Sequence, residues 1–128
     1  MAKLSKGTAG EVLAARFLRE KGYEIWAANY GCRFGEIDII AAKEPYIAFI
    51  EVKTRSEDSI YEPREAVTKD KQNRIIKTAM LFIKNNRIEL QPRFDVIEII
   101  TRNRRPMEVV ELDHIQGAFD AGDLHAAF

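Results

Sequence analysis

The sequence contains very little cysteine and histidine, and this excludes several classes of protein. Its one cysteine, Cys32, cannot form an internal disulfide and suits a reducing compartment. One cysteine and two distant histidines also lack the ligand spacing of a structural zinc site. No apolar run approaches the roughly 20 residues that cross a bilayer, and the first residues have no apolar signal core. We therefore expect a cytoplasmic protein that does not enter a membrane.

An excess of charge of one sign is also missing, because 20 basic and 20 acidic residues give a net charge of +0. This balance weighs against tight non-specific binding of nucleic acid, which depends on neutralising phosphates. A local basic surface is still compatible with it, since basic residues gather in two parts of the chain. The first group is Lys69, Lys71, Arg74 and Lys77, and the second is Arg102, Arg104 and Arg105.

Length and composition indicate one globular domain. A chain of 128 residues can bury a core of its own, and 46% apolar and 31% charged residues are ordinary for such a protein. Hydrophobic periodicity and turn residues predict two helices and five strands. The helices are expected over residues 5–22 and 63–85, and the strands over 23–30, 35–42, 46–54, 93–101 and 106–112.

The connections between these elements predict the architecture. A short link at residues 43–45 makes an antiparallel hairpin of the second and third strands. The long second helix carries the chain to a fourth strand that should lie parallel to the third. The result is an α/β fold, a mixed β-sheet flanked by helices in the order α-β-β-β-α-β-β. Residues 1–112 would form this domain and residues 113–128 its C-terminal tail, with a loop over 55–62 and a short helix over 115–119.

Three charged residues in two predicted strands are the strongest functional signal. Asp38 lies in the apolar run 35–40, and Glu51 and Lys53 lie in the apolar run 47–53. Apolar strands of this kind are usually buried on both faces, where a carboxylate is costly unless it is paired or binds a cation. Side chains alternate along a strand, so Glu51 and Lys53 share one face. The register that would bring Asp38 to them is left open by the sequence.

If the two strands meet at these positions, Asp38 and Glu51 supply hard oxygen ligands for a Mg²⁺-type ion. Such an ion polarises a phosphate and lowers the pKa of a bound water. Lys53 would then stabilise charge on the phosphate or orient the attacking water. The plainer alternative is a cross-strand salt bridge between Lys53 and an acid, because this spacing arises easily in a charged chain. The burial of the charges favours a metal-dependent phosphodiesterase site.

Five further residues are candidates for this site, each with a plainer alternative. Glu11 lies along the apolar stripe of the first helix, so it could be a metal ligand or simply favour the helix N-terminus. Lys71 and Gln72 could contact a phosphate from the second helix or lie on its solvated edge. Arg55 could bind a phosphate bidentately as the chain leaves the third strand. Arg33 lies in a basic and aromatic segment that suits stacking on a base or forms the rim of the core.

Four residues outside this group have open or plain interpretations. Asp95 lies in the apolar fourth strand and could hold an arginine, either Arg93 or Arg33, or serve the site. His114 and His125 are expected on the surface of the tail. Trp26 is expected in the core.

Taken together, these residues resemble the YraN-like family of small bacterial proteins over roughly residues 5–112. The matching segments are 10–11 (Gly-Glu), 22–23 (Gly-Tyr), 33–40 (Arg-Phe-Gly-Glu-Ile-Asp-Ile-Ile), 49–55 (Phe-Ile-Glu-Val-Lys-Thr-Arg) and 93–97 (Arg-Phe-Asp-Val-Ile). That family is similar to the restriction-endonuclease-like superfamily, close to archaeal Holliday-junction resolvases. The resemblance implies a Mg²⁺ or Mn²⁺ site built from Glu11, Asp38 and Glu51, with Lys53 as the catalytic lysine. The superfamily often has Pro before the first Asp, where this chain has Ile37.

Two functions follow as hypotheses. The first is a divalent-metal-dependent nuclease that acts on DNA, with branched or single-stranded forms as candidate substrates, and that works as a homodimer if it cuts two strands symmetrically. The second is a nucleic-acid-binding or accessory module that keeps the fold but has little activity, which the neutral net charge favours. A third, plainer hypothesis is a structural protein with a salt-bridged hairpin.

Overall fold

The structure of the protein, a computed structural model, describes residues 6–59, 67–102, 106 and 108–121. This part contains two α-helices, α1 (Lys6–Glu20) and α2 (Lys69–Asn86), and a short 3₁₀ turn, η1 (Glu57–Ser59). Its five strands are β1 (Glu24–Cys32), β2 (Gly35–Lys43), β3 (Tyr46–Ser56), β4 (Gln91–Arg102) and β5 (Glu108–Phe119). The predicted α/β class and the order α-β-β-β-α-β-β are therefore confirmed.

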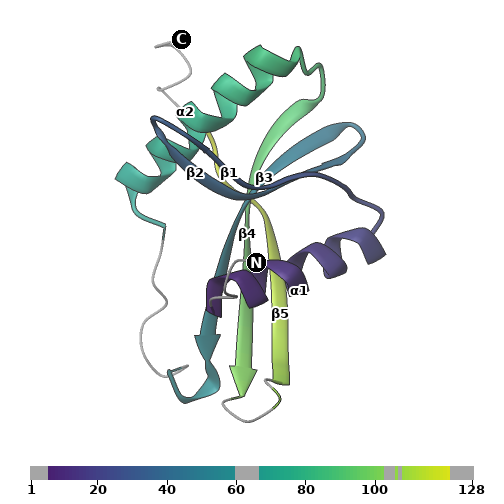
Figure 1. Cartoon of the computed structure of the whole chain (residues 1–128), viewed down its shortest axis with the longest axis vertical. Helices are drawn as coiled ribbons and strands as arrows, with labels where there is room; N and C mark the ends of the chain where they lie inside the picture. Colours follow the sequence, from purple (N-terminus) through teal and green to yellow (C-terminus); the bar gives the residue numbers. More distant parts are fainter. Residues whose placement is uncertain (1–5, 60–66, 103–105, 107, 122–128) are drawn as a thin grey trace, which may run out of the picture.

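The strands form one mixed sheet in the order β1-β2-β3-β4-β5 (Figure 1). β1, β2 and β3 pair antiparallel as a meander, because their connections are short. β3 and β4 are parallel, with α2 in the crossover between them, and β5 returns antiparallel beside β4. The lengths of the connections thus predict the strand directions correctly.

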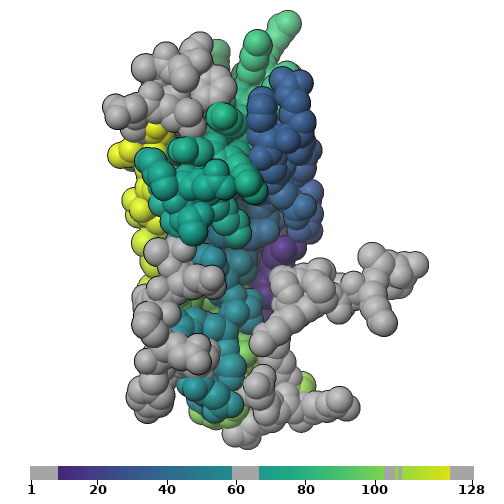
Figure 2. Space-filling model, turned by 90° about the vertical axis from the view of Figure 1, so that its left-hand side faces the viewer, coloured from purple at the N-terminus to yellow at the C-terminus, as the bar shows by residue number. Residues whose placement is uncertain are grey.

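The two helices cover opposite faces of the twisted sheet, because successive residues of a buried strand point to opposite sides (Figure 1). On one face, Ala14 and Leu18 of α1 pack in one core with Ala48 and Ile50. The alternate residues of β3 point toward α2, which lies between the β1–β2 hairpin (blue) and β5 (yellow) in Figure 2. The main members of this second core are Ile47, Phe49, Ile75, Ile76, Ala79 and Phe82.

Local hydrogen bonds define the ends of the helices. After α1, Gly22 takes a φ of 92°, a left-handed conformation that glycine adopts without strain. The N–H of Tyr23 then donates to the carbonyl of Leu18 at 2.9 Å and closes the helix. α2 begins after Thr68, whose hydroxyl accepts from the backbone N–H of Lys71 at 3.2 Å. Neither these helices nor any other in the described residues are long and apolar enough to cross a membrane.

The segment between β3 and α2 differs from the prediction at both ends. The second helix does not begin at residue 63, because the cap at Thr68 starts it at Lys69. The loop predicted over residues 55–62 is wrong at its start, because β3 continues to Ser56 and η1 follows it. Residues 60–66 lie outside the described part of the chain.

The predicted tail is the largest difference. β5 extends to Phe119, so the short helix expected over residues 115–119 is wrong, and residues 113–119 belong to the sheet. The strand pattern is interrupted by Gly117, which has a φ of 61°, and by a shift in the β4–β5 register between Phe94 and Val96. This bulge hides the two-residue period from which a strand is recognised. Residues 122–128, with His125, lie outside the described residues.

Trp26 is not a core residue, because 42% of its surface is exposed. The β1–β2 register shifts between Ile25 and Ala27, so Trp26 is the extra residue of a bulge. Its two neighbours pack against the cores on the two faces, and Trp26 is left outside.

Candidate functional site

The sheet forks between β2 and β3, and the predicted acidic residues meet at this fork. The β2–β3 ladder ends with the pair Ile39 and Ile50, beyond which β3 continues beside β4. There, the side chain of Asp38 replaces the backbone of β2 as the hydrogen-bond acceptor for β3. Its Oδ2 accepts the N–H of Val52 at 2.7 Å. The fork therefore holds Asp38 next to Glu51, which is the contact that the sequence left open.

The pKa of the Asp38 carboxyl group is strongly raised at this fork. Burial raises the pKa of Asp38, and the nearby charges of Glu51 and Glu11 raise it further, to about 7. A hydrogen bond between the Asp38 and Glu51 side chains acts in the same direction, while the bond from the N–H of Val52 opposes it. Glu51 itself is buried, with 7% of its surface exposed. A cation beside Asp38 would offset these neighbouring negative charges and favour its ionised form.

A basic side chain of α2 already contacts this acidic pair. Nζ of Lys71 lies 2.5 Å from Oε1 of Glu51. Both residues line an open pocket of about 510 Å³, together with Asp38, Thr68 and Arg74. Glu36 and Asp70 also line the pocket, and Asp70 pairs with Arg74 at 3.0 Å. The pocket thus combines four carboxylates with two basic groups beside the N-terminus of α2, where the helix dipole favours an anion.

Lys53 lies two residues after Glu51 on β3 and shares its α2-facing side. Its side chain is half-buried, and it is not among the described residues that line the pocket. The residue in register with it on β4 is Glu98, which is buried with 7% of its surface exposed. Sequence reasoning missed Glu98, although it is an acid in an apolar strand, the same signal that identified Asp38.

Glu11 reaches the fork because α1 approaches β3 closely. A Cβ on Gly10 would lie 2.3 Å from Oγ1 of Thr54, so glycine is required at this contact. Oε2 of Glu11 is buried and has no hydrogen-bond partner among the described residues. Its charge nevertheless acts on Asp38, whose pKa it helps to raise. A buried carboxylate oxygen without a donor is costly, and this favours a cation in its neighbourhood.

Replacing Gly10 by Ala should destabilise the protein, although alanine favours a helix by about 1 kcal/mol. The added methyl group would overpack the α1–β3 contact at a cost of about 1–3 kcal/mol, so we expect a net loss. Urea unfolding measures the change, with Val12→Ala at an exposed position of the same helix as the control. A Gly10→Ala protein more stable than the wild type would contradict the close approach of α1 to β3.

The other predicted phosphate contacts are not among the described residues that line the pocket. The side-chain amide of Gln72 donates to the carbonyl of Val67 at 2.9 Å and so supports the start of α2. Arg55 is half-buried near the end of β3, on the face that also carries Lys53. Arg33 is exposed in the β1–β2 turn, where its guanidinium lies 4.8 Å from the centre of the Phe34 ring.

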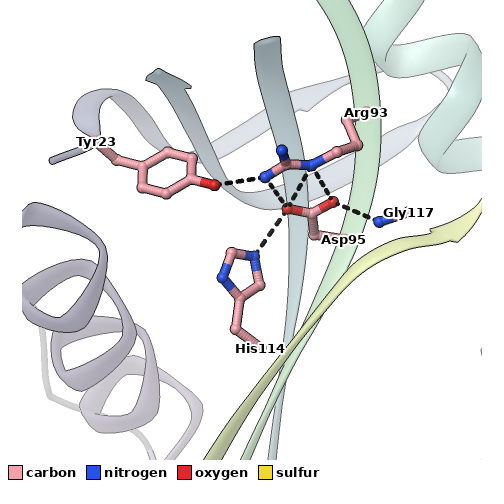
Figure 3. A network of polar contacts seen from close by, with 5 residues as sticks. All are labelled: Tyr23, Arg93, Asp95, His114 and Gly117. Atoms are coloured by element: carbon pink, nitrogen blue, oxygen red, sulfur yellow. Dashed lines mark hydrogen bonds and ion pairs between the residues drawn. The ribbon is translucent and has the colours of Figure 1, made fainter. Parts of the chain in front are cut away.

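A second buried carboxylate, that of Asp95 on β4, has a complete set of partners (Figure 3). It accepts three hydrogen bonds from Arg93, whose Nη2 lies 2.8 Å from Oδ2 and whose Nε lies 2.9 Å from Oδ1 and 3.2 Å from Oδ2. It also contacts Nε2 of His114 at 2.8 Å and accepts the N–H of Gly117 at 3.0 Å. Arg93 in turn donates to the hydroxyl of Tyr23 at 2.6 Å. Of the alternatives open for Asp95, the structure thus shows the pairing with Arg93.

The Asp95 network fastens β5 to the sheet. Burial raises the pKa of Asp95, but its hydrogen bonds with His114 and Arg93 outweigh burial and hold the pKa below its usual range. The expectation that His114 lies on the surface is wrong, because only 7% of its side chain is exposed. Its ring packs edge-on against Phe17 and Tyr23, with centroids 6.1 and 6.0 Å apart. Asp95 therefore has a structural role on the α1 face of the sheet.

Asp38 and Glu51 are the residues best suited to hold a divalent ion. In the described part of the chain, no group of three or more Asp, Glu, His or Cys side chains forms a finished metal-binding cluster. In the observed side-chain conformations, Glu11 therefore does not form a three-ligand set with Asp38 and Glu51. Glu51 is instead paired with Lys71. The close carboxyl pair, and the Glu11 oxygen that lacks a partner in the described part of the chain, still fit a hard cation such as Mg²⁺ or Mn²⁺, which completes its shell with water.

Comparison with known proteins identifies relatives over most of the chain. Residues 10–99 match the model of the uncharacterised protein family UPF0102. A UPF0102 protein of Caldanaerobacter subterraneus subsp. tengcongensis is 41% identical over 118 residues, which cover 91% of this chain and 96% of the relative. One from Acetivibrio thermocellus is 42% identical over 120 residues, covering 91% and 92%. One from Clostridium perfringens is 49% identical over 96 residues, covering 74% and 79%. The resemblance to YraN-like proteins is confirmed.

Proposed function

Because this chain belongs to the uncharacterised protein family UPF0102, we propose its function from the site itself: a divalent-metal-dependent nuclease that hydrolyses DNA phosphodiester bonds. The observation that carries the proposal is the close pair of half-buried Asp38 and buried Glu51 at the fork of the sheet, in which Glu51 raises the pKa of Asp38. A fold loses stability by holding two such groups together, so the arrangement is typical of a functional site. The pocket beside the pair also presents Lys71 and Arg74, which suit a phosphate.

Each residue of the site has a role in this proposal. Asp38 and Glu51 would hold Mg²⁺ or Mn²⁺, and Glu11 would support it from α1. When bound, the ion polarises the phosphate and lowers the pKa of a water ligand. Lys53 would stabilise negative charge on the scissile phosphate or orient the attacking water. Lys71 and Arg74 would hold the phosphate at the N-terminus of α2.

The DNA would run past the pocket and contact positively charged side chains outside it. Arg33 and Arg55 would contact the backbone beside the site, and Gln72 would support α2. Branched and single-stranded DNA are the preferred candidates, since the site is open and its net charge provides little affinity for plain duplex. Cleavage of two strands would call for a homodimer.

A second candidate function is a nucleic-acid-binding or accessory module without cleavage. The net charge of +0 favours it, because DNA affinity would then have to come from local basic groups alone. The close pair of Asp38 and Glu51 argues against it, since a pure binding module has no need of two carboxylates held together beside the sheet core.

Cleavage by a Lys53→Ala variant separates the two candidates. We expect the wild type, with Mg²⁺ or Mn²⁺, to cut at least one of a panel of duplex, single-stranded, flapped and four-way-junction DNA. The variant should lose roughly 10²–10³-fold in rate, the usual effect of removing one group that stabilises transition-state charge, while its DNA binding changes little. Lys84→Ala, at an exposed position in the last turn of α2, is the matched control.

Two other outcomes would contradict this proposal or part of it. A folded wild type that binds these DNAs but cuts none of them in excess metal would favour the accessory module. Equal cutting by wild type and Lys53→Ala would remove Lys53 from the mechanism.

A further inference from the structure

The contact between Lys71 and Glu51 joins two residues of very different exposure. Glu51 is held in the sheet with 8% of its side chain exposed, whereas 47% of the Lys71 side chain is open to solvent. The pair lies in the pocket that also contains Asp38. The Glu51 side chain is thus fixed in the sheet, whereas the ammonium group of Lys71 can move into water because its four-carbon stem is flexible.

We infer that Lys71 is a built-in counter-ion, which holds Glu51 in the absence of metal and which the divalent ion must displace. The inference rests on the proposed metal site and adds to it a competition between one side chain of this protein and the metal. It also assigns a second task to Lys71, because the released ammonium group stays in the same pocket and becomes available to a phosphate.

The electrostatics of the fork explain why such a counter-ion is needed. The charges of Glu11 and Glu51 both act on Asp38, and Oε2 of Glu11 is buried without a hydrogen-bond partner among the described residues. Without a cation, these charges would repel an ionised Asp38 strongly. Lys71 neutralises part of the repulsion, and a divalent ion would neutralise more of it.

The backbone around Lys71 is held in place by contacts that do not involve its side chain. The N–H of Lys71 donates to the Thr68 hydroxyl at the cap of α2, which fixes the main chain at this point. The helix beyond it is anchored by Ile75 and Ile76, both buried against the sheet. Release of Glu51 can therefore proceed through rotation of the Lys71 side chain while the helix stays in place.

Direct metal binding tests this competition. Mn²⁺ is titrated calorimetrically into the full-length wild type and into Lys71→Met, which keeps most of the stem and removes the charge. If Lys71 competes with the ion, Lys71→Met should bind Mn²⁺ roughly fivefold or more tightly, within the usual range of coupling between two linked sites. Lys69→Ala removes the same charge from an exposed position in the same helical turn and should change the affinity much less. Asp38→Asn should lose the binding, which confirms that the ion occupies this site.

Linkage provides a second readout that needs no substitution. If Mn²⁺ displaces Lys71, then Mn²⁺ must increase the reactivity of the Lys71 amine toward an acylating reagent, measured by mass spectrometry against Lys69 as the internal control. Unchanged or weaker Mn²⁺ affinity in Lys71→Met, with unchanged labelling in the wild type, overturns the counter-ion and leaves the nuclease proposal standing. No Mn²⁺ binding by the wild type or any variant overturns both.

Discussion

Replacing Asp95 by Ala is expected to lower the free energy of unfolding by about 3–5 kcal/mol, the range for removing one partner of a buried ion pair. Asp95 has no exposed surface and accepts hydrogen bonds from Arg93 and from the backbone of Gly117. It also contacts His114. The substitution would leave the donors of these groups in the core without an acceptor. Leaving a buried donor unsatisfied costs more free energy than a typical hydrogen bond contributes to stability.

Urea unfolding at neutral pH measures this loss. The control is Glu111→Ala, an exposed acid on β5 that should shift stability by no more than about 0.5 kcal/mol. In the Arg93→Ala background, Asp95→Ala should cost clearly less than it does in the wild type, because the buried guanidinium is already gone. A loss below about 1 kcal/mol for Asp95→Ala would contradict the role of the network in fastening β5.

Those parts of the fold that depend on continuous apolar runs and short connections are predictable from the sequence. β2, β3 and β4 are buried on both faces, and their runs of apolar residues identify them directly. Gly22 marks the end of α1 because the closing turn needs a left-handed residue. β5 is different, since its bulge at Gly117 breaks the strand period, and the partner of its inward-facing His114 lies on another strand.

The candidate site is predictable only in part, for a physical reason. Buried acids in apolar strands identify Asp38 and Glu51, because the cost of burying charge can be judged from neighbouring residues alone. The fork that joins them depends on where the β2–β3 ladder stops, and the Lys71 contact depends on how α2 crosses the sheet. Both are long-range results of packing that local patterns do not contain.

The last prediction concerns the conflict between stability and function at Asp38. Its pKa is raised from 3.8 to about 7 in the folded protein. Between about pH 4 and 7 the folded protein therefore keeps a proton that the unfolded chain releases, so stability falls as pH rises through this window and stays low above it. Asparagine cannot ionise, and its oxygen can still accept the N–H of Val52.

In metal-free buffer at pH 8, Asp38→Asn should therefore be more stable than the wild type by about 1–2 kcal/mol, a figure reduced for the partial exposure of the group. The difference should shrink toward zero near pH 4. Urea unfolding in the presence of a chelator, repeated across this pH range, measures it. Glu36→Gln, an exposed acid two residues earlier on β2, is the control and should show no such trend.

The same Asp38→Asn variant should lose cleavage and should no longer be stabilised by Mg²⁺, because it removes one of the two carboxylates that hold the ion. Gain of stability combined with loss of metal response is expected of a residue kept for chemistry at the expense of folding. A salt-bridged hairpin without a metal site makes the opposite prediction. It requires Asp38→Asn to be less stable than the wild type at pH 8, because an ionised Asp38 would then contribute to the fold.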